Sequence, residues 1–81
     1  MQPAQTLTLE ALTPGSESQI AEVQGERSFQ RRLFDLGFVP GTSITLIRKA
    51  ILGDPLEVKL RGYHLAIRKK DARKILLRGL R

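Results

Sequence analysis

The chain of 81 residues contains no cysteine, no tryptophan and a single histidine. Without cysteine it cannot form a disulfide, a thiolate zinc site or a cysteine nucleophile, and one histidine excludes a multi-histidine metal site within one chain. We therefore expect a cytosolic protein that needs no cofactor. A chain of this length buries only somewhat over roughly 60% of its unfolded surface, so one small domain, residues 1–81, is expected.

Long apolar segments are missing as well. The longest stretch without Asp, Glu, Lys or Arg is residues 36–47, and glycine and proline residues interrupt it. A membrane-spanning helix needs about 20 apolar residues, so none is expected. The first twenty residues lack a basic segment followed by a continuous apolar run, so no export signal is expected either.

Basic residues are absent from residues 1–26, which hold four acidic residues. The formal charge of +6 is therefore the sum of −4 for this segment and +10 for the rest, which contains 14 basic and 4 acidic residues. Residues 68–81 alone hold seven basic residues and one acidic residue, a charge of +6. Such a bias suggests an acidic partner, which could be nucleic acid, an anionic membrane surface or a protein.

The chain does contain a series of short alternating segments between turn signals. Residues 7–12 predict a strand that ends before a Pro-Gly turn, residues 18–24 predict a weaker strand, and residues 43–49 predict a longer one. A basic helical turn follows near residues 70–73, and residues 75–77 predict a last strand. No internal repeat is present.

A hairpin is predicted between residues 56–60 and residues 63–67, because both segments alternate around a two-residue turn at Arg61-Gly62. The register pairs Leu60 with Tyr63, Val58 with Leu65 and Leu56 with Ile67. All six apolar side chains would then share one face of the sheet.

One segment has the period of a helix. Phe29, Leu33 and Leu36 stand at positions i, i+4 and i+7 and form one apolar stripe. Gly37 follows as a natural left-handed residue after the last turn, and Phe38 is placed to fold back onto that turn.

The fold class predicted from these patterns is mainly β. Five or six short strands would form a small barrel, because closure removes exposed sheet edges. One α-helix at about residues 28–36 would lie between the early and the middle strands.

Two blocks of sequence carry a family resemblance. They are residues 31–42 (RRLFDLGFVPGT) and residues 53–72 (GDPLEVKLRGYHLAIRKKDA), with a weaker segment at residues 9–15. In order and spacing they resemble the FeoA family, small cytoplasmic partners of the bacterial ferrous iron transporter FeoB. The motif residues are expected to be structural: Leu33, Asp35, Leu36, Gly37, Pro40, Gly41, Gly53, Pro55 and Gly62.

The resemblance implies an SH3-like barrel, the fold also found at the C-terminus of DtxR-type metal-dependent repressors. It further implies a non-enzymatic accessory protein that binds the cytoplasmic, G-protein-like part of FeoB and modulates ferrous iron uptake. Such a protein would lie in the cytoplasm, through its partner at the inner face of the inner membrane. The alternative is a nucleic-acid-binding or metal-responsive regulatory domain, and weak self-association stays open. The sequence shows no catalytic motif.

The loop at residues 50–56 is one candidate for partner binding. Ile51 and Leu52 are adjacent large aliphatic residues, and they are either core plugs or contacts for the partner. Asp54 either bonds nearby backbone amides at a turn or belongs to the same contact surface.

The basic residues near the C-terminus are the other candidate. We predict that they form one patch, which is either a solvated face or a surface for an acidic partner or anionic lipid. These residues are Arg68, Lys69, Lys70, Arg73 and Lys74.

His64 is the only imidazole, and the hairpin register places Lys59 opposite it. One nitrogen ligand with scattered carboxylates makes a poor metal site, so an exposed strand histidine is expected and no Fe(II) or zinc site within one chain. A metal that bridges two molecules through His64 stays open.

Overall fold

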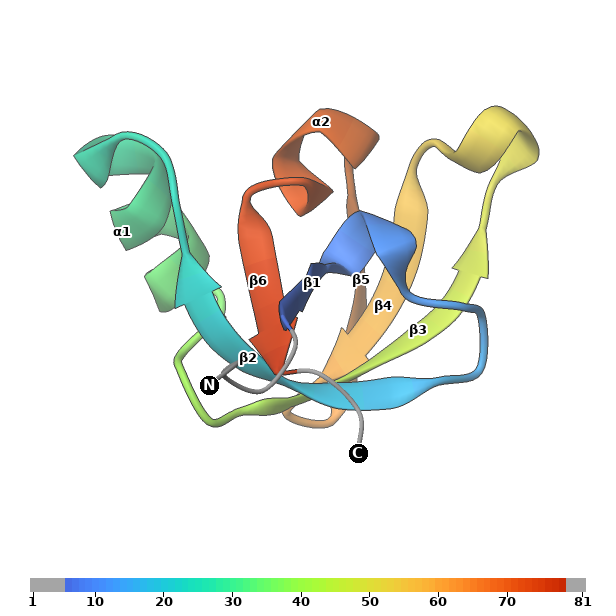
Figure 1. Cartoon of the computed structure of the whole chain (residues 1–81), viewed down its shortest axis with the longest axis horizontal. Helices are drawn as coiled ribbons and strands as arrows, with labels where there is room; N and C mark the ends of the chain where they lie inside the picture. Colours follow the sequence, from blue (N-terminus) through green and yellow to red (C-terminus); the bar gives the residue numbers. More distant parts are fainter. Residues whose placement is uncertain (1–5, 79–81) are drawn as a thin grey trace, which may run out of the picture.

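The computed structural model describes residues 6–78. Two α-helices and two 3-10 turns are interspersed among six strands (Figure 1). In chain order the elements are β1 (Thr6–Thr8), η1 (Leu9–Ala11), β2 (Glu17–Val23), α1 (Arg27–Asp35), β3 (Ser43–Lys49), η2 (Ile51–Gly53), β4 (Leu56–Leu60), β5 (Tyr63–Ile67), α2 (Lys69–Ala72) and β6 (Ile75–Arg78).

The strands form one antiparallel sheet in the order β1-β6-β2-β3-β4-β5. The long strand β2 pairs with β3 through its first half and with β6 through its second half, so the sheet curls around a core. Figure 1 shows α1, α2 and the η2 turn at the same end of this curled sheet. The mainly β fold predicted from the sequence is confirmed.

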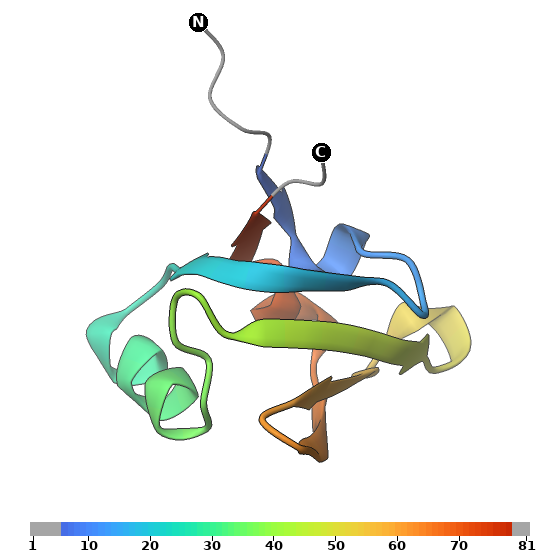
Figure 2. The ribbon, with the colours of Figure 1, turned by 90° about the horizontal axis from the view of Figure 1, so that it is seen from below.

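The sheet keeps two edge strands. Within residues 6–78, β1 pairs only with β6, and β5 pairs only with β4. Figure 2 shows β1 and the β4–β5 hairpin at opposite borders of the sheet. Backbone groups on the outer side of β5 are therefore left without a strand partner.

The predicted hairpin has the expected register, with Leu56 opposite Ile67 and Lys59 opposite His64. Arg61 and Gly62 have φ values of 53° and 86°. A two-residue hairpin turn needs positive φ at both residues, because its backbone twist then matches that of the two strands. Tyr63 pairs with Leu60 as predicted, and its side chain at the end of the hairpin is 41% exposed. Its hydroxyl donates a hydrogen bond to the backbone carbonyl oxygen of Leu36 and so ties the hairpin to the end of α1.

Helix α1 ends in the predicted glycine cap. Gly37 has φ +108°, its N–H donates to the Phe34 carbonyl, and the N–H of Phe38 donates to the Leu33 carbonyl, both at 2.9 Å. This cap turns the chain inward and buries Phe38 completely. The expected role of Leu36 as a core anchor is wrong: it lies beyond the last helical residue, and its side chain is 40% exposed.

The first strand is shorter than predicted. It ends at Thr8, and the η1 turn replaces its second half. A strand would point Leu9 and Leu12 to opposite faces, whereas the turn buries both side chains. The demand for burial therefore overrides the alternating pattern here.

The core fills the concave side of the sheet and is closed by α1, η1 and α2. Apolar side chains from five strands meet there, with partly buried Leu7 and Leu65 packed against them. The buried members are Leu9, Leu12, Ile20, Val23, Phe29, Leu33, Phe38, Ile44, Leu46, Leu56, Val58, Leu60, Ile67, Ala72, Ile75 and Leu77.

Candidate docking surface

The η2 turn carries the two most exposed large apolar side chains of the described residues. Ile51 is 88% exposed and Leu52 is 90% exposed, so the core-plug alternative for this pair is wrong. An adjacent aliphatic pair with this exposure is available to contact a partner.

The backbone of this turn is held in place rather than open. Its base is closed by hydrogen bonds from Ala50 N–H to the Pro55 carbonyl at 3.0 Å and from Gly53 N–H to the Ala50 carbonyl at 2.7 Å. Leu52 has φ +65°, a conformation that costs a residue with a Cβ atom roughly 1–2 kcal/mol. Strain of this kind is frequent at functional sites.

Asp54 joins the turn to α2. Its Oδ1 atom accepts a hydrogen bond from the backbone N–H of Lys69 at 2.9 Å and lies 3.4 Å from Nε of Arg68. Asp54 therefore bonds a backbone amide, as predicted, but this amide lies 15 residues further along the chain and not in the turn itself. The carboxylate satisfies one of the free N–H groups at the start of α2.

The five basic candidates, residues 68–70 together with Arg73 and Lys74, lie on α2 or next to it in the chain. Glu10 of η1 neutralises part of their charge, because its carboxylate lies 2.9 Å from Nε of Arg73 and 3.8 Å from Nζ of Lys69. Lys74 lies over the Phe29 ring, with 4.7 Å from Nζ to the ring centroid. The basic side chains of this surface are thus partly neutralised by Glu10. This neutralisation weakens the long-range attraction of the surface for a polyanion.

Sequence reasoning did not find Glu10. The carboxylate lies 63 residues before Arg73, in a segment predicted to be a strand, and no local pattern signals such a contact. Only the curling of the sheet brings η1 against α2.

His64 is exposed on the outer face of β5. Its Nδ1 atom lies 3.6 Å from an oxygen of Glu57, whose carboxylate also accepts a hydrogen bond from Arg48 at 2.8 Å. Across residues 6–78, no three side chains of His, Asp or Glu come close enough together to hold a metal ion. The same residues include no helix long and apolar enough to cross a membrane.

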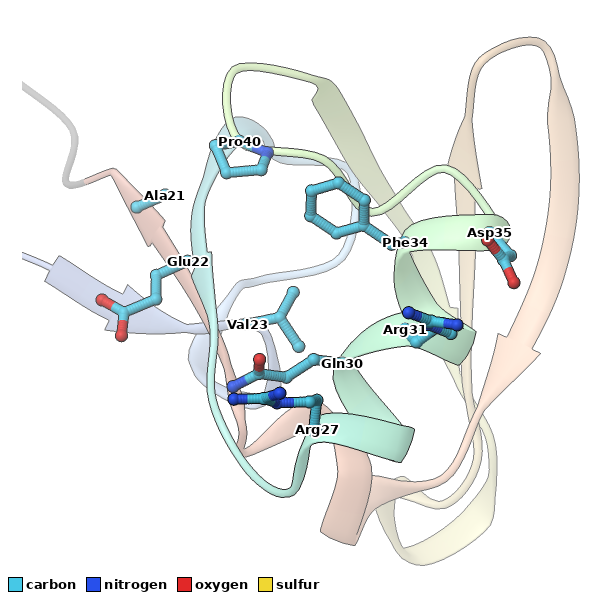
Figure 3. Close-up of a pocket in the computed structure, with 9 residues that line it drawn as sticks. All are labelled: Ala21, Glu22, Val23, Arg27, Gln30, Arg31, Phe34, Asp35 and Pro40. Carbon is cyan, nitrogen blue, oxygen red and sulfur yellow. The ribbon is translucent and has the colours of Figure 1, made fainter.

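A cleft of about 460 Å³ lies between α1 and β2 (Figure 3). It is lined by Ala21, Glu22, Val23, Arg27, Gln30, Arg31, Phe34, Asp35 and Pro40. Figure 3 shows Phe34 and Val23 pointing into the cleft, Arg27 and Gln30 at one end of it, and Glu22 pointing away.

Phe34 is 51% exposed, although it belongs to the same helix as the buried Phe29 and Leu33. The missed signal was its position outside the stripe of Phe29 and Leu33. The cleft can hold an apolar group, and a guanidinium stands at one end of it.

A curled antiparallel sheet with one capped helix and an exposed aliphatic turn defines a small SH3-like β domain. The family model described as the FeoA domain matches residues 7–79, and the chain belongs to the FeoA family. The predicted family membership is confirmed.

One relative is a fusion of the Fe(2+) transport protein A with the Fe(2+) transporter FeoB in Porphyromonas gingivalis. The chain is 35% identical to it over 69 residues, which are 85% of this chain. They are 8% of the fusion protein, so the chain corresponds to a small part of that relative.

Two solved FeoA structures have the same fold. FeoA of Chlorobium tepidum is 36% identical, with a TM-score of 0.84 over 93% of this chain and 71% of that one. FeoA of Stenotrophomonas maltophilia, a prokaryotic SH3 domain protein crystallised with zinc, is 28% identical, with a TM-score of 0.78 over 88% of each chain.

The predicted likeness to metal-dependent repressors is found at the level of the fold. A manganese-dependent transcriptional repressor gives a TM-score of 0.85 over 98% of this chain and 44% of its own, at 12% identity. Identity this low establishes a common fold and nothing about a common function.

Proposed function

We propose that this chain is a non-enzymatic accessory protein of bacterial ferrous iron uptake that binds the cytoplasmic, G-protein-like part of FeoB and modulates the transporter. Its docking surface would consist of the η2 turn and α2. Through FeoB, the protein would lie in the cytoplasm close to the inner membrane. The observation that carries this proposal is the fusion of a related domain to FeoB within one polypeptide.

Fusion supports physical association, because two domains joined by a linker meet at a high effective concentration. A separate chain lacks that advantage and needs contacts of its own. Complete burial of an Ile or Leu side chain contributes about 1.5–3 kcal/mol, so the exposed pair Ile51 and Leu52 has the capacity for about 3–6 kcal/mol.

The basic residues beside the turn suit an acidic rim around this apolar centre. Lys70 is exposed, and no carboxylate among residues 6–78 lies within 4 Å of its amine. Complementary charges at a rim raise the association rate more than the affinity.

The test is the affinity of purified full-length FeoB, and of its isolated G domain, for the double variant Ile51→Ser/Leu52→Ser. Loss of both apolar contacts should weaken binding at least about 100-fold, since 1.4 kcal/mol corresponds to a factor of ten. Fluorescence anisotropy with labelled FeoA-family protein in detergent gives the Kd.

Phe34→Ser is the matched control, because Phe34 is also an exposed large apolar residue but lies at the α1–β2 cleft. It should bind FeoB as the unmodified chain does. Full affinity in the double variant, or an equal loss in the control, contradicts docking through η2. A gel shift with nucleic acid at physiological salt, without FeoB binding, contradicts the proposed function as a whole.

A further inference from the structure

Strand β5 offers an unused row of backbone hydrogen-bonding groups. It ends the sheet, and within residues 6–78 its only strand partner is β4. A two-residue turn is closed by a hydrogen bond from the N–H after the turn, here that of Tyr63, so this N–H faces β4. Because direction alternates along a strand, the N–H and C=O groups of His64 and Ala66 face away from β4.

Two pockets flank this edge. An inner pocket of about 160 Å³ lies between β5, α2 and the end of α1, and an outer pocket of about 310 Å³ lies on the opposite face of the sheet. Leu65 and Ala66 line both pockets, so the edge of β5 is the ridge between them.

Both pockets have mainly apolar walls, and they differ in their polar side chains. The inner pocket has Leu36 in its wall and Arg32 and Asp71 among its lining residues. The outer pocket includes the side chains of Arg48, His64 and Glu57. Side chains of an extended segment alternate between two faces, so an added strand would place every second residue over each pocket.

We infer that the β5 edge binds an extended segment of a partner protein as an additional antiparallel or parallel strand, in which aliphatic residues alternate with Asp or Glu. The aliphatic side chains enter the inner pocket, and the acidic side chains lie over the outer face. Backbone hydrogen bonds to His64 and Ala66 hold the segment, as in other cases of strand addition.

Charge favours an acidic segment. On the outer face, where the acidic side chains would lie, Arg48 and His64 line the pocket. The guanidinium of Arg48 uses only its Nε group for Glu57. Since a guanidinium has five N–H donors, it can bind a second carboxylate.

A second copy of this chain is a less favourable occupant than an acidic segment, because both copies carry a formal charge of +6 and repel each other.

The β5 edge continues into the proposed docking surface. Arg68 follows β5, lines the inner pocket and lies 3.4 Å from Asp54 at the base of the η2 turn. The inference thus deepens the proposed function and rests on it for the partner: a segment of FeoB outside its folded G domain adds to β5 while the G domain contacts η2.

The first experiment measures amide hydrogen exchange by NMR on the full ¹⁵N-labelled chain. The probes are overlapping 15-residue synthetic peptides that cover the cytoplasmic part of FeoB, and a designed peptide in which Val alternates with Glu. We expect the amides of His64 and Ala66 to be protected at least tenfold by the peptides that bind. Binding without protection of these two amides overturns the inference.

The second experiment compares Ala66→Pro with the control Phe34→Ser, which lies at the α1–β2 cleft and outside the β5 edge, in binding full-length FeoB. Proline removes the outward N–H but is tolerated at a sheet edge. The proline variant should bind at least about tenfold more weakly, and the Phe34→Ser variant should bind as the unmodified chain does. If Ala66→Pro fails to fold, the exchange experiment decides alone.

The outcomes separate the two proposals. FeoB binding that Ala66→Pro leaves intact overturns the strand addition and leaves the proposed function standing. Absence of any FeoB binding overturns both. Protection of His64 and Ala66 that grows with the concentration of the chain alone assigns the edge to a second copy and overturns the inference.

Discussion

Strand β3 and the η2 turn that follows it place the same kinds of side chain in opposite environments. Ile44 and Leu46 are completely buried, whereas Ile51 and Leu52 are 88% and 90% exposed. The first pair points from a curved strand into the core. The second pair stands on a turn that leaves the sheet, so its apolar surface adds little to stability and is open to contact.

The two regions are also held differently. The β3 residues lie between two hydrogen-bonded neighbours, β2 and β4. The η2 turn is held by its own backbone hydrogen bonds and by the contacts of Asp54 with α2. The difference indicates that substitutions at the turn can alter the surface without unfolding the sheet.

The largest effect is expected from replacing a leucine by alanine, once in β3 and once in the η2 turn. Leu46→Ala should lower the free energy of unfolding by about 2–5 kcal/mol, because it removes buried methyl groups and leaves a cavity. For a domain of this size the fall in Tm is at least roughly 8 °C. Leu52→Ala should change the free energy by less than about 0.5 kcal/mol.

Urea denaturation followed by circular dichroism measures both variants. Equal destabilisation by Leu46→Ala and Leu52→Ala would mean that the turn packs against the core, and the contrast would disappear.

An intermediate effect is expected where the turn is attached to α2. Asp54→Ala removes the acceptor for the Lys69 amide and the partner of Arg68, and it should cost about 1 kcal/mol, as the loss of a helix cap does. Asp54→Asn keeps an oxygen acceptor and should cost less. Urea denaturation of the two variants orders them, and an equal loss of stability in both would show that the charge, not the acceptor, matters.

The smallest effect concerns the strained residue of the turn. Leu52→Gly relieves the cost of φ +65° but makes the unfolded chain more flexible, so a net stabilisation of about 0.5 kcal/mol is expected. The same variant should bind FeoB more weakly, because it lacks the exposed side chain. Differential scanning calorimetry measures the Tm, and a lower Tm than that of the unmodified chain would refute stored strain at this position.

Local patterns predicted the parts of the fold that depend on neighbouring residues. The hairpin register followed from alternation around a two-residue turn, and the end of α1 followed from Gly37. The apolar stripe predicted for α1 included Leu36, which lies beyond the end of the helix. A periodic pattern does not reveal that the glycine cap has already turned the chain away from the helix axis at that point.

The candidate site was predicted only in part. Adjacent Ile51 and Leu52 marked the turn, but the sequence left burial and exposure equally open. The links through Asp54 and Glu10 join segments 15 and 63 residues apart, and neither has a local signal. The role of all these residues in partner binding stays a prediction.

The sequence by itself determined the polarised charge, the lack of cysteine, the helix with its glycine cap and the pairing of the hairpin. These features depend on composition or on residues within a few positions of one another. Only the tertiary structure decided which aliphatic residues are exposed, which basic residues have acidic partners and that β5 has, among residues 6–78, a strand partner on one side alone. Such properties depend on how the sheet curls, and therefore on contacts between residues far apart in the chain.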